Sequence, residues 1–365
     1  MSESKKGIRI QYIDIIKSLA ISMVVLIHIN FANAVVKPWA TAFVMPTFFF
    51  ASGLLLKTET GTLKTELAFC WKKFQGIMIP YFIWTLIYHL VWVLFNRSLG
   101  GVSALLNILY GSHQSLGNAH TLTSIWCLPV LFLAMVLFSV CRLLFKDKLN
   151  LPVKLILVVV FLAMGAVIPK LSNGYPWGVN LVPTAFGFLM LGNALFPVLE
   201  RVRQRLNSKG GLAILISGTV VCFAVTFLYL LNIPECGYIH VAIAAYGNYL
   251  LFLVVAFDGI AFILFLSLLL DRMLSKKQTA ISRFFNFLGK STLCILFTHK
   301  LFTHYVFKTL FRFVHVPNVV ALIVTWIGTI AGCSLAALFI QRFLPFLLGH
   351  FPVRKTKQQN TDKNN

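Results

Sequence analysis

Apolar residues in this chain occur in long runs that are separated by short polar connections. A helix needs on the order of 20 apolar residues to cross a bilayer, and the runs have about this length. The pattern therefore predicts an all-α, polytopic integral membrane protein with about ten transmembrane helices. The predicted spans are Ile10–Phe31, Trp39–Leu56, Gly76–Phe95, Leu122–Phe145, Leu155–Ile168, Val179–Leu199, Leu212–Leu231, Tyr246–Leu270, Phe284–Val306 and Val319–Leu348.

Some of these segments allow a second interpretation. The second and fifth spans are short, and the stretch Tyr238–Leu270, which contains Gly247 and Asn248, is long enough to include a re-entrant piece. The run Ser18–Ile27 followed by Ala32–Ala34 also has the form of a signal peptide with its cleavage site. We interpret it as the first transmembrane helix.

Basic residues gather at every second connection, which predicts the orientation. The clusters are Lys5, Lys6 and Arg9; Lys57, Lys64, Lys72 and Lys73; Arg142, Lys146, Lys148 and Lys154; Arg201, Arg203, Arg205 and Lys209; Arg272, Lys276, Lys277 and Arg283; and Arg354, Lys355, Lys357 and Lys363. By the positive-inside rule both termini are cytoplasmic, which requires an even number of spans. The ninth connection, with Lys300, Lys308 and Arg312, is the exception.

Composition agrees with a membrane protein. Of 365 residues, 58% are apolar and 12% are charged, and one soluble core cannot bury so many apolar side chains. The net charge of +22 lies in short connections instead of one patch, which argues against nucleic-acid binding. The seven cysteines form no zinc or redox motif. We predict a membrane-embedded domain over residues 1–348 and a polar cytoplasmic tail over residues 349–365.

The first span carries polar residues that lipid does not favour. Asp14, Lys17 and His28 fall on one side of a helix, so they form a polar stripe that points into the protein. Lys17 and His28 are roughly 16 Å apart along the axis, a spacing suited to the two ends of an elongated ligand. The alternative is purely structural: Asp14 and Lys17 pair at the cytoplasmic surface, and His28 packs near the opposite one.

Other polar candidates favour structural interpretations. Asp258 is a lone carboxylate in the eighth span, and His299 in the ninth fits a hydrogen-bonded packing residue. The connection between the third and fourth spans is polar and aromatic. It includes Tyr110, Ser112, His113, Gln114, Asn118 and His120. Such a loop suits a sugar, although polar loops are common without one.

Five segments in order resemble acyltransferase family 3 membrane proteins, particularly the branch with fucose 4-O-acetylase-like enzymes. They are YIDIIKSLAISMVVLIH (Tyr12–His28), MPTFFFASG (Met45–Gly53), WKKFQGIMIPYFIW (Trp71–Trp84), IWCLPVLF (Ile125–Phe132) and FLGKSTLCILFTHKL (Phe287–Leu301). The first matches the family's acid, basic residue and histidine. Gln75 and Gly76 depart from the third, where further basic residues are common.

The resemblance implies an O-acyltransferase that moves an acyl group, usually acetyl from acetyl-CoA, to a sugar hydroxyl of a surface or secreted glycan. It implies His28 as base or nucleophile, and it adds Asp14 and Lys17 as the other candidate catalytic residues. Candidate donor-binding residues are Lys72, Lys73 and Ser52. Candidate acceptor-binding residues are His113, His120 and Trp126. No bound cofactor, metal or nucleic acid is implied, and acetyl-CoA enters as a co-substrate.

The expected partners are an acyl-CoA, a glycan or lipid-linked sugar, and the bilayer, in a bacterial plasma membrane. His28 lies roughly 27 Å along its helix from the cytoplasmic start, near the outer surface. A cytosolic thioester would therefore reach into the bundle, with its phosphates near the lysines. The alternative function is a polytopic transporter or glycan flippase, against which the lack of a detectable repeat between the two halves counts.

Overall fold

The structure, a computed structural model, describes residues 10–29, 36–59, 61–96, 101–206, 208, 210–232, 239–274, 279–314 and 316–349. In these ranges the chain is helical, and its extended pairing is limited to an isolated antiparallel bridge between His240 and Ala245. The prediction of an all-α polytopic membrane protein is confirmed. The predicted tail from residue 350 onward, the first basic cluster and the Ala32–Ala34 motif lie outside the described residues.

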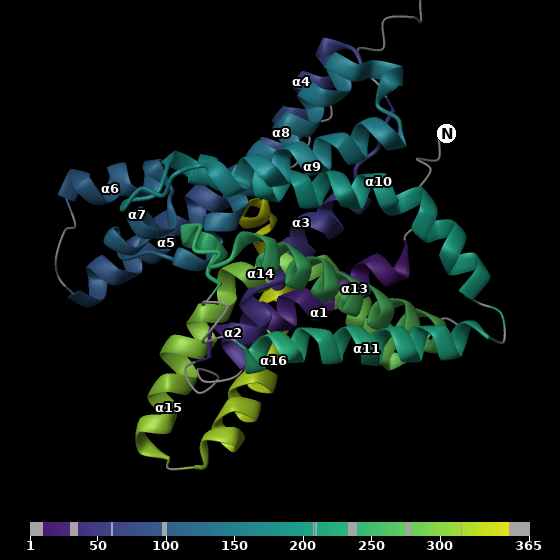
Figure 1. Cartoon of the computed structure of the whole chain (residues 1–365). Coiled ribbons are helices and arrows are strands. Elements are labelled where there is room, and N and C mark those ends of the chain that lie inside the picture. The colour runs from purple at the N-terminus through teal and green to yellow at the C-terminus, as the bar shows by residue number, and fades with distance from the viewer. Residues whose placement is uncertain are drawn as a thin grey trace, which may run out of the picture.

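Each of the ten predicted spans contains at least one helix (Figure 1). The helices are α1 (Gln11–Ile27), α2 (Val36–Thr41) with α3 (Val44–Leu54), α5 (Ile79–Asn96), α8 (Cys127–Phe145), α9 (Leu151–Val167), α10 (Val182–Leu206), α11 (Gly211–Leu231), α13 (Tyr249–Leu274), α14 (Ala280–Lys300) and α16 (Asn318–Phe343). Among the described residues, six helical segments are long and apolar enough to span a membrane, those that contain α5, α8, α10, α11, α13 and α16. The other spans consist of shorter or more polar helices.

Further helices lie between the spans. An 11-residue helix, α4 (Leu63–Lys73), continues through the π-helical turn η2 (Phe74–Met78) into α5. The long connection after α5 holds α6 (Gly101–Tyr110) and α7 (His113–Asn118), followed by the 3₁₀ turn η3 (Thr123–Trp126). After α14, a second π-helical segment, η7 (Leu301–Phe307), leads into α15 (Lys308–Phe313). η7, α15 and the start of α16 project from the bundle (Figure 1).

The segment that was expected to allow a re-entrant piece has a simpler structure. Residues Val241–Ile243 form one 3₁₀ turn, η6, before α13 begins. Gly247 adopts a positive φ of 60°, and the Asn248 side chain accepts a hydrogen bond from the Leu251 amide at 3.1 Å. Gly247 and Asn248 therefore mark the start of α13, because these residue types suit a turn and a helix cap.

The second span contains the short helix α3, which has 11 residues and is enclosed by other helices. It packs against α1, α10 and α13, and most of its residues are buried. Gly53 of α3 lies so close to α10 that a Cβ atom there would be 1.8 Å from the Leu189 carbonyl oxygen. Gly192 of α10 approaches the Phe50 carbonyl in the same way. Small residues at helix crossings let backbones approach closely, and here they fix α3 against α10.

The first helix lies inside the bundle and contacts α3, α13, α14 and α16 (Figure 1). The Ser18 hydroxyl of α1 is 2.6 Å from the Phe285 carbonyl oxygen of α14. Gly289 of α14 lies directly against Asp14, with no room for a Cβ atom. Helix α1 is thus surrounded by protein, which explains how its polar residues avoid lipid.

Candidate active site

A cavity of about 460 Å³ lies at the C-terminal end of α1, and we call it the outer cavity. Its walls come from α1, α2, α3, α7, η3, η6, α14 and η7. His28 lines it, together with the predicted acceptor residues His113 and Trp126. The fold therefore brings the candidate catalytic histidine and two of the three candidate acceptor residues to one cavity.

The imidazole of His28 is held by its own helix. Its Nδ1 atom lies 2.7 Å from the carbonyl oxygen of Val24, one turn earlier. Because a carbonyl can only accept, Nδ1 carries the proton in this contact, and the lone pair of the neutral ring lies on Nε2. A histidine with a fixed Nδ1–H presents Nε2 as the basic or nucleophilic atom.

A second histidine packs against the first. The ring centroids of His28 and His299 are 4.9 Å apart in an edge-on arrangement. His299 is fully buried, and its Nδ1 atom is 2.9 Å from the Leu296 carbonyl oxygen. Its Nε2 atom is buried and has no hydrogen-bond partner among the described residues. His299 is therefore a hydrogen-bonded, buried residue, as the sequence suggested. Its contact with His28 was not predicted.

A second cavity of about 270 Å³, the inner cavity, lies farther toward the start of α1. Lys17, Ser52, Lys290 and Thr292 supply its polar lining, and the other lining residues are mostly apolar. Met45 lines both cavities. Lys17 and His28 of the α1 polar stripe thus line different cavities, and the Met45 side chain lines both.

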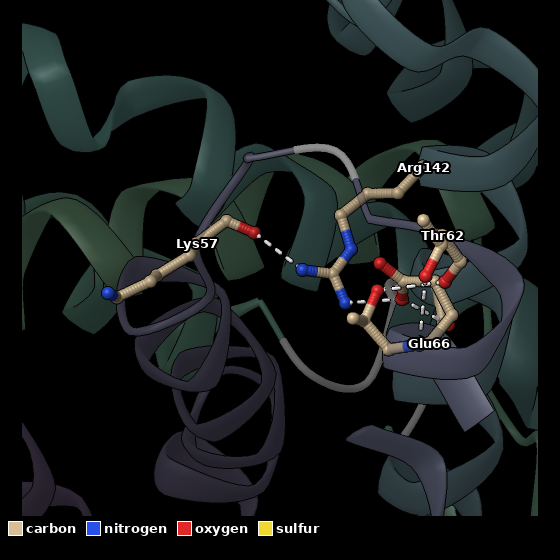
Figure 2. A network of polar contacts seen from close by, with 6 residues as sticks. Lys57, Thr62, Glu66 and Arg142 are labelled. Carbon is tan, nitrogen blue, oxygen red and sulfur yellow. Dashed lines mark hydrogen bonds and ion pairs between the residues drawn. The ribbon is translucent and has the colours of Figure 1, made fainter. Parts of the chain in front are cut away.

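Lys72 and Lys73 lie at the end of α4, and the structure shows how this helix is positioned. The Glu66 carboxylate of α4 forms a buried ion pair with Arg142 of α8 at 2.6 Å, and the Ser139 hydroxyl donates to the same carboxylate oxygen. Arg142 also donates to the Lys57 carbonyl oxygen at 3.0 Å (Figure 2). This network fixes both ends of the connection between α3 and α4.

The two lysines differ in their surroundings. Lys72 is exposed, whereas Lys73 is half-buried with its ammonium 5.3 Å from the Phe69 ring centroid. Lys73 lies within electrostatic range of Lys17. The sequence suggested Lys72 and Lys73 as donor-binding residues, and the fold brings Lys73 and Lys17 into one positively charged region.

Two other candidates lie away from the cavities. His120 is exposed, adopts a positive φ of 51° and stacks on Trp92 at a centroid distance of 4.1 Å. Asp14 is buried under Gly289 and lines neither cavity. Asp14 lies about one helical turn before Lys17, at the contact between α1 and α14, so its role is in the packing of these helices and not in the lining of a cavity.

The outer cavity contains further basic residues that sequence reasoning did not assign to a site. They are Lys37, His240, Lys300 and His304. Burial and the neighbouring His240 and Lys300 lower the pKa of His113 to about 4, and burial also lowers the pKa of His240. Both imidazoles are therefore neutral near pH 7. Lys300 directly follows His299 in the Phe287–Leu301 segment that resembles the family. This segment is the feature of the sequence that could have identified Lys300 as a site residue.

The fold and these cavities define a class: a polytopic, all-helical membrane protein with a histidine in the wall of its outer cavity and a lysine of the same helix in the wall of its inner cavity. Residues 10–338 match the family described as the acyltransferase domain, acyltransferase family 3. The chain belongs to this family, and it is a membrane acyltransferase. No curated protein and no solved structure gives a significant match to it.

Proposed function

We propose that the chain is an O-acyltransferase that moves an acyl group, acetyl in the simplest case, from acetyl-CoA to a sugar hydroxyl of a surface or secreted glycan. The observation that carries this proposal is His28, whose Nδ1 is fixed by Val24 and whose ring lines the outer cavity. A histidine held in this way suits removal of a proton from an acceptor hydroxyl.

The reaction balances with this single base. Nε2 of His28 takes the hydroxyl proton while the acceptor oxygen bonds to the thioester carbonyl carbon. The carbon–sulfur bond then breaks, and the CoA sulfur leaves as the thiolate, which takes up the proton. In the second route, Nε2 first attacks the thioester carbonyl carbon, the carbon–sulfur bond breaks, and CoA leaves as the thiolate. The acceptor hydroxyl then attacks the acyl carbon, the bond to Nε2 breaks, and the hydroxyl proton passes to the thiolate. Both routes need the donor and the acceptor to reach His28, together in the first route and in turn in the second.

The two cavities support access from opposite sides of the membrane. The inner cavity contains Lys17 and Ser52 in a mostly apolar lining, which suits the pantetheine arm of the donor. The charged region of Lys17 and Lys73 suits its phosphates, because ammonium groups bind phosphate oxygens strongly. The acyl end would pass Met45 to reach His28. The proposed location is the bacterial plasma membrane, with Lys72 and Lys73 on the cytoplasmic side.

Replacing His28 tests the proposal. His28→Gln keeps the size and hydrogen bonding of the side chain but lacks a basic or nucleophilic nitrogen, so acylation of the glycan should fall by at least about 100-fold, the usual contribution of a general base. The measurement is the acyl content of purified glycan from cells that carry each variant, with protein level checked in the same membranes. Normal acylation by the glutamine variant would show that His28 only packs.

A further inference from the structure

Every ionisable side chain that lines the outer cavity is basic. They are His28, Lys37, His113, His240, Lys300 and His304. No aspartate or glutamate of the described residues lines this cavity. Because the chain has 32 lysines and arginines against 10 acidic residues, a basic lining alone is weak evidence. The positions of the two lysines make it stronger.

Most basic residues of the chain lie in the connections predicted to be cytoplasmic, whereas Lys37 and Lys300 lie in connections predicted to be external. They come from α2 and from the end of α14, which are far apart in sequence, and they meet at one cavity. Lys37 lies within electrostatic range of Lys300, His28 and His240. The fold therefore concentrates positive charge around the candidate base.

Neither lysine forms an ion pair with a carboxylate in the part of the chain that the structure describes. Lys300 donates to the Thr123 hydroxyl at 3.1 Å, a neutral partner. Two half-buried ammonium groups within range repel each other, and this repulsion costs more in a cavity than in open water. A bound anion offsets that cost and supplies charged hydrogen-bond acceptors.

We propose that the outer cavity binds an anionic acceptor, a sugar whose phosphate or carboxylate lies between Lys37 and Lys300 and whose hydroxyl faces His28. This inference rests on the proposed function, and it specifies the class of acceptor. The cavity volume of about 460 Å³ lies within the range of about 300–1,000 Å³ that small-molecule sites occupy. Trp126 offers an apolar face for the sugar ring, and the neutral His113 offers a hydrogen bond.

Two other occupants fit the cavity less well. The four histidines that line it do not form, among the described residues, a group of three that could hold a metal ion. The phosphates of acyl-CoA are the other candidate anion, but the donor is expected to enter through the inner cavity, which Lys17 lines and where Lys73 lies within electrostatic range of Lys17. Lys37 and Lys300 are therefore assigned to the acceptor.

The test measures binding to the full-length protein in lipid nanodiscs. Three probes are compared by titration calorimetry: glucose 1-phosphate, glucuronate and glucose. At least one anionic probe should bind about ten-fold or more tightly than glucose, because hydrogen bonds to charged groups contribute on this scale. A preference for glucose 1-phosphate would indicate a phosphate-linked sugar, and a preference for glucuronate would indicate an acidic sugar. Equal affinity for all three probes would overturn the proposal.

Variants assign the effect to the two lysines. Lys37→Gln and Lys300→Gln should each weaken binding of the preferred anion about ten-fold, with little change for glucose. Lys37→Arg should retain binding, which separates loss of charge from loss of folding. Lys308→Gln, which removes a lysine of α15 outside the cavity lining, is the matched control and should bind like the wild type. Unchanged affinity in Lys37→Gln and Lys300→Gln would overturn the proposal.

Two further measurements separate the inference from the proposed function. Displacement of the anionic probe by free CoA, with the same dependence on Lys37, would show that the lysines bind the donor and would overturn the inference. His28→Gln should keep anion binding while it loses acylation. Anion binding without acylation in the wild type would count against the proposed function, whereas acylation of a neutral glycan without any anion preference would count against the inference.

Discussion

At the scale of single residues, the sequence predicted best where the relevant neighbours lie on one helix. Asp14, Lys17 and His28 share a helix, so their relative positions followed from the helical repeat. The same reasoning could not place Lys37 or Lys300 beside His28, because these contacts depend on how α2 and α14 pack around α1. His299 was identified as a hydrogen-bonded residue, but its position against His28 is also a tertiary contact.

The role of Lys17 gives a prediction at this scale. Lys17→Ala should weaken binding of CoA to the detergent-purified protein by about ten-fold or more, because it removes one ammonium from the region that also contains Lys73. Lys17→Arg should retain most of the affinity, since the charge remains. Lys64→Ala removes an exposed lysine of α4 that does not line the inner cavity, and it serves as the control. Wild-type CoA affinity in Lys17→Ala would rule out the donor role.

At the scale of helices, apolar runs predicted the spans, but they did not predict their ends. The second span splits into α2 and α3 because α3 is short and enclosed by protein. Helix α4 was not recognised because it is polar, and its position depends on the buried pair between Glu66 and Arg142. The sequence analysis counted Arg142 only in a basic cluster and did not single out Glu66, because the pairing depends on how α4 packs against α8.

The crossing of α3 and α10 gives a prediction for a helix contact. Gly53→Ala should lower the melting temperature of the protein in detergent, because the new Cβ atom would meet the Leu189 carbonyl and force the helices apart. Gly76→Ala is the matched control, since a Cβ atom at Gly76 meets nothing within 4 Å. In an open helical position, alanine is usually favoured over glycine by about 1 kcal/mol. Equal melting temperatures of Gly53→Ala and the wild type would contradict the close crossing.

At the scale of the whole molecule, charge and hydropathy together predicted the architecture, because lipid requires every span to satisfy its backbone internally. The cavities were not predictable in the same way, since each takes walls from several elements that are distant in sequence. Figure 1 shows α6 and α7 at one end of the bundle and the adjoining ends of α10 and α11 at the other. The outer cavity takes part of its wall from α7, which lies at the first of these two ends.

The topology prediction follows from this arrangement. Reporters inserted at Lys170, between α9 and α10, should read as external, whereas reporters after Arg205 or after Lys355 should read as cytoplasmic, because the basic clusters remain inside. Paired alkaline phosphatase and green fluorescent protein fusions at each site provide the measurement, since the two reporters are active on opposite sides. A cytoplasmic result at Lys170 would place His28 and Lys73 on the wrong sides for donor and acceptor. Agreement at all three sites would place the inner cavity toward acyl-CoA and the outer cavity toward the glycan, as the proposed transfer requires.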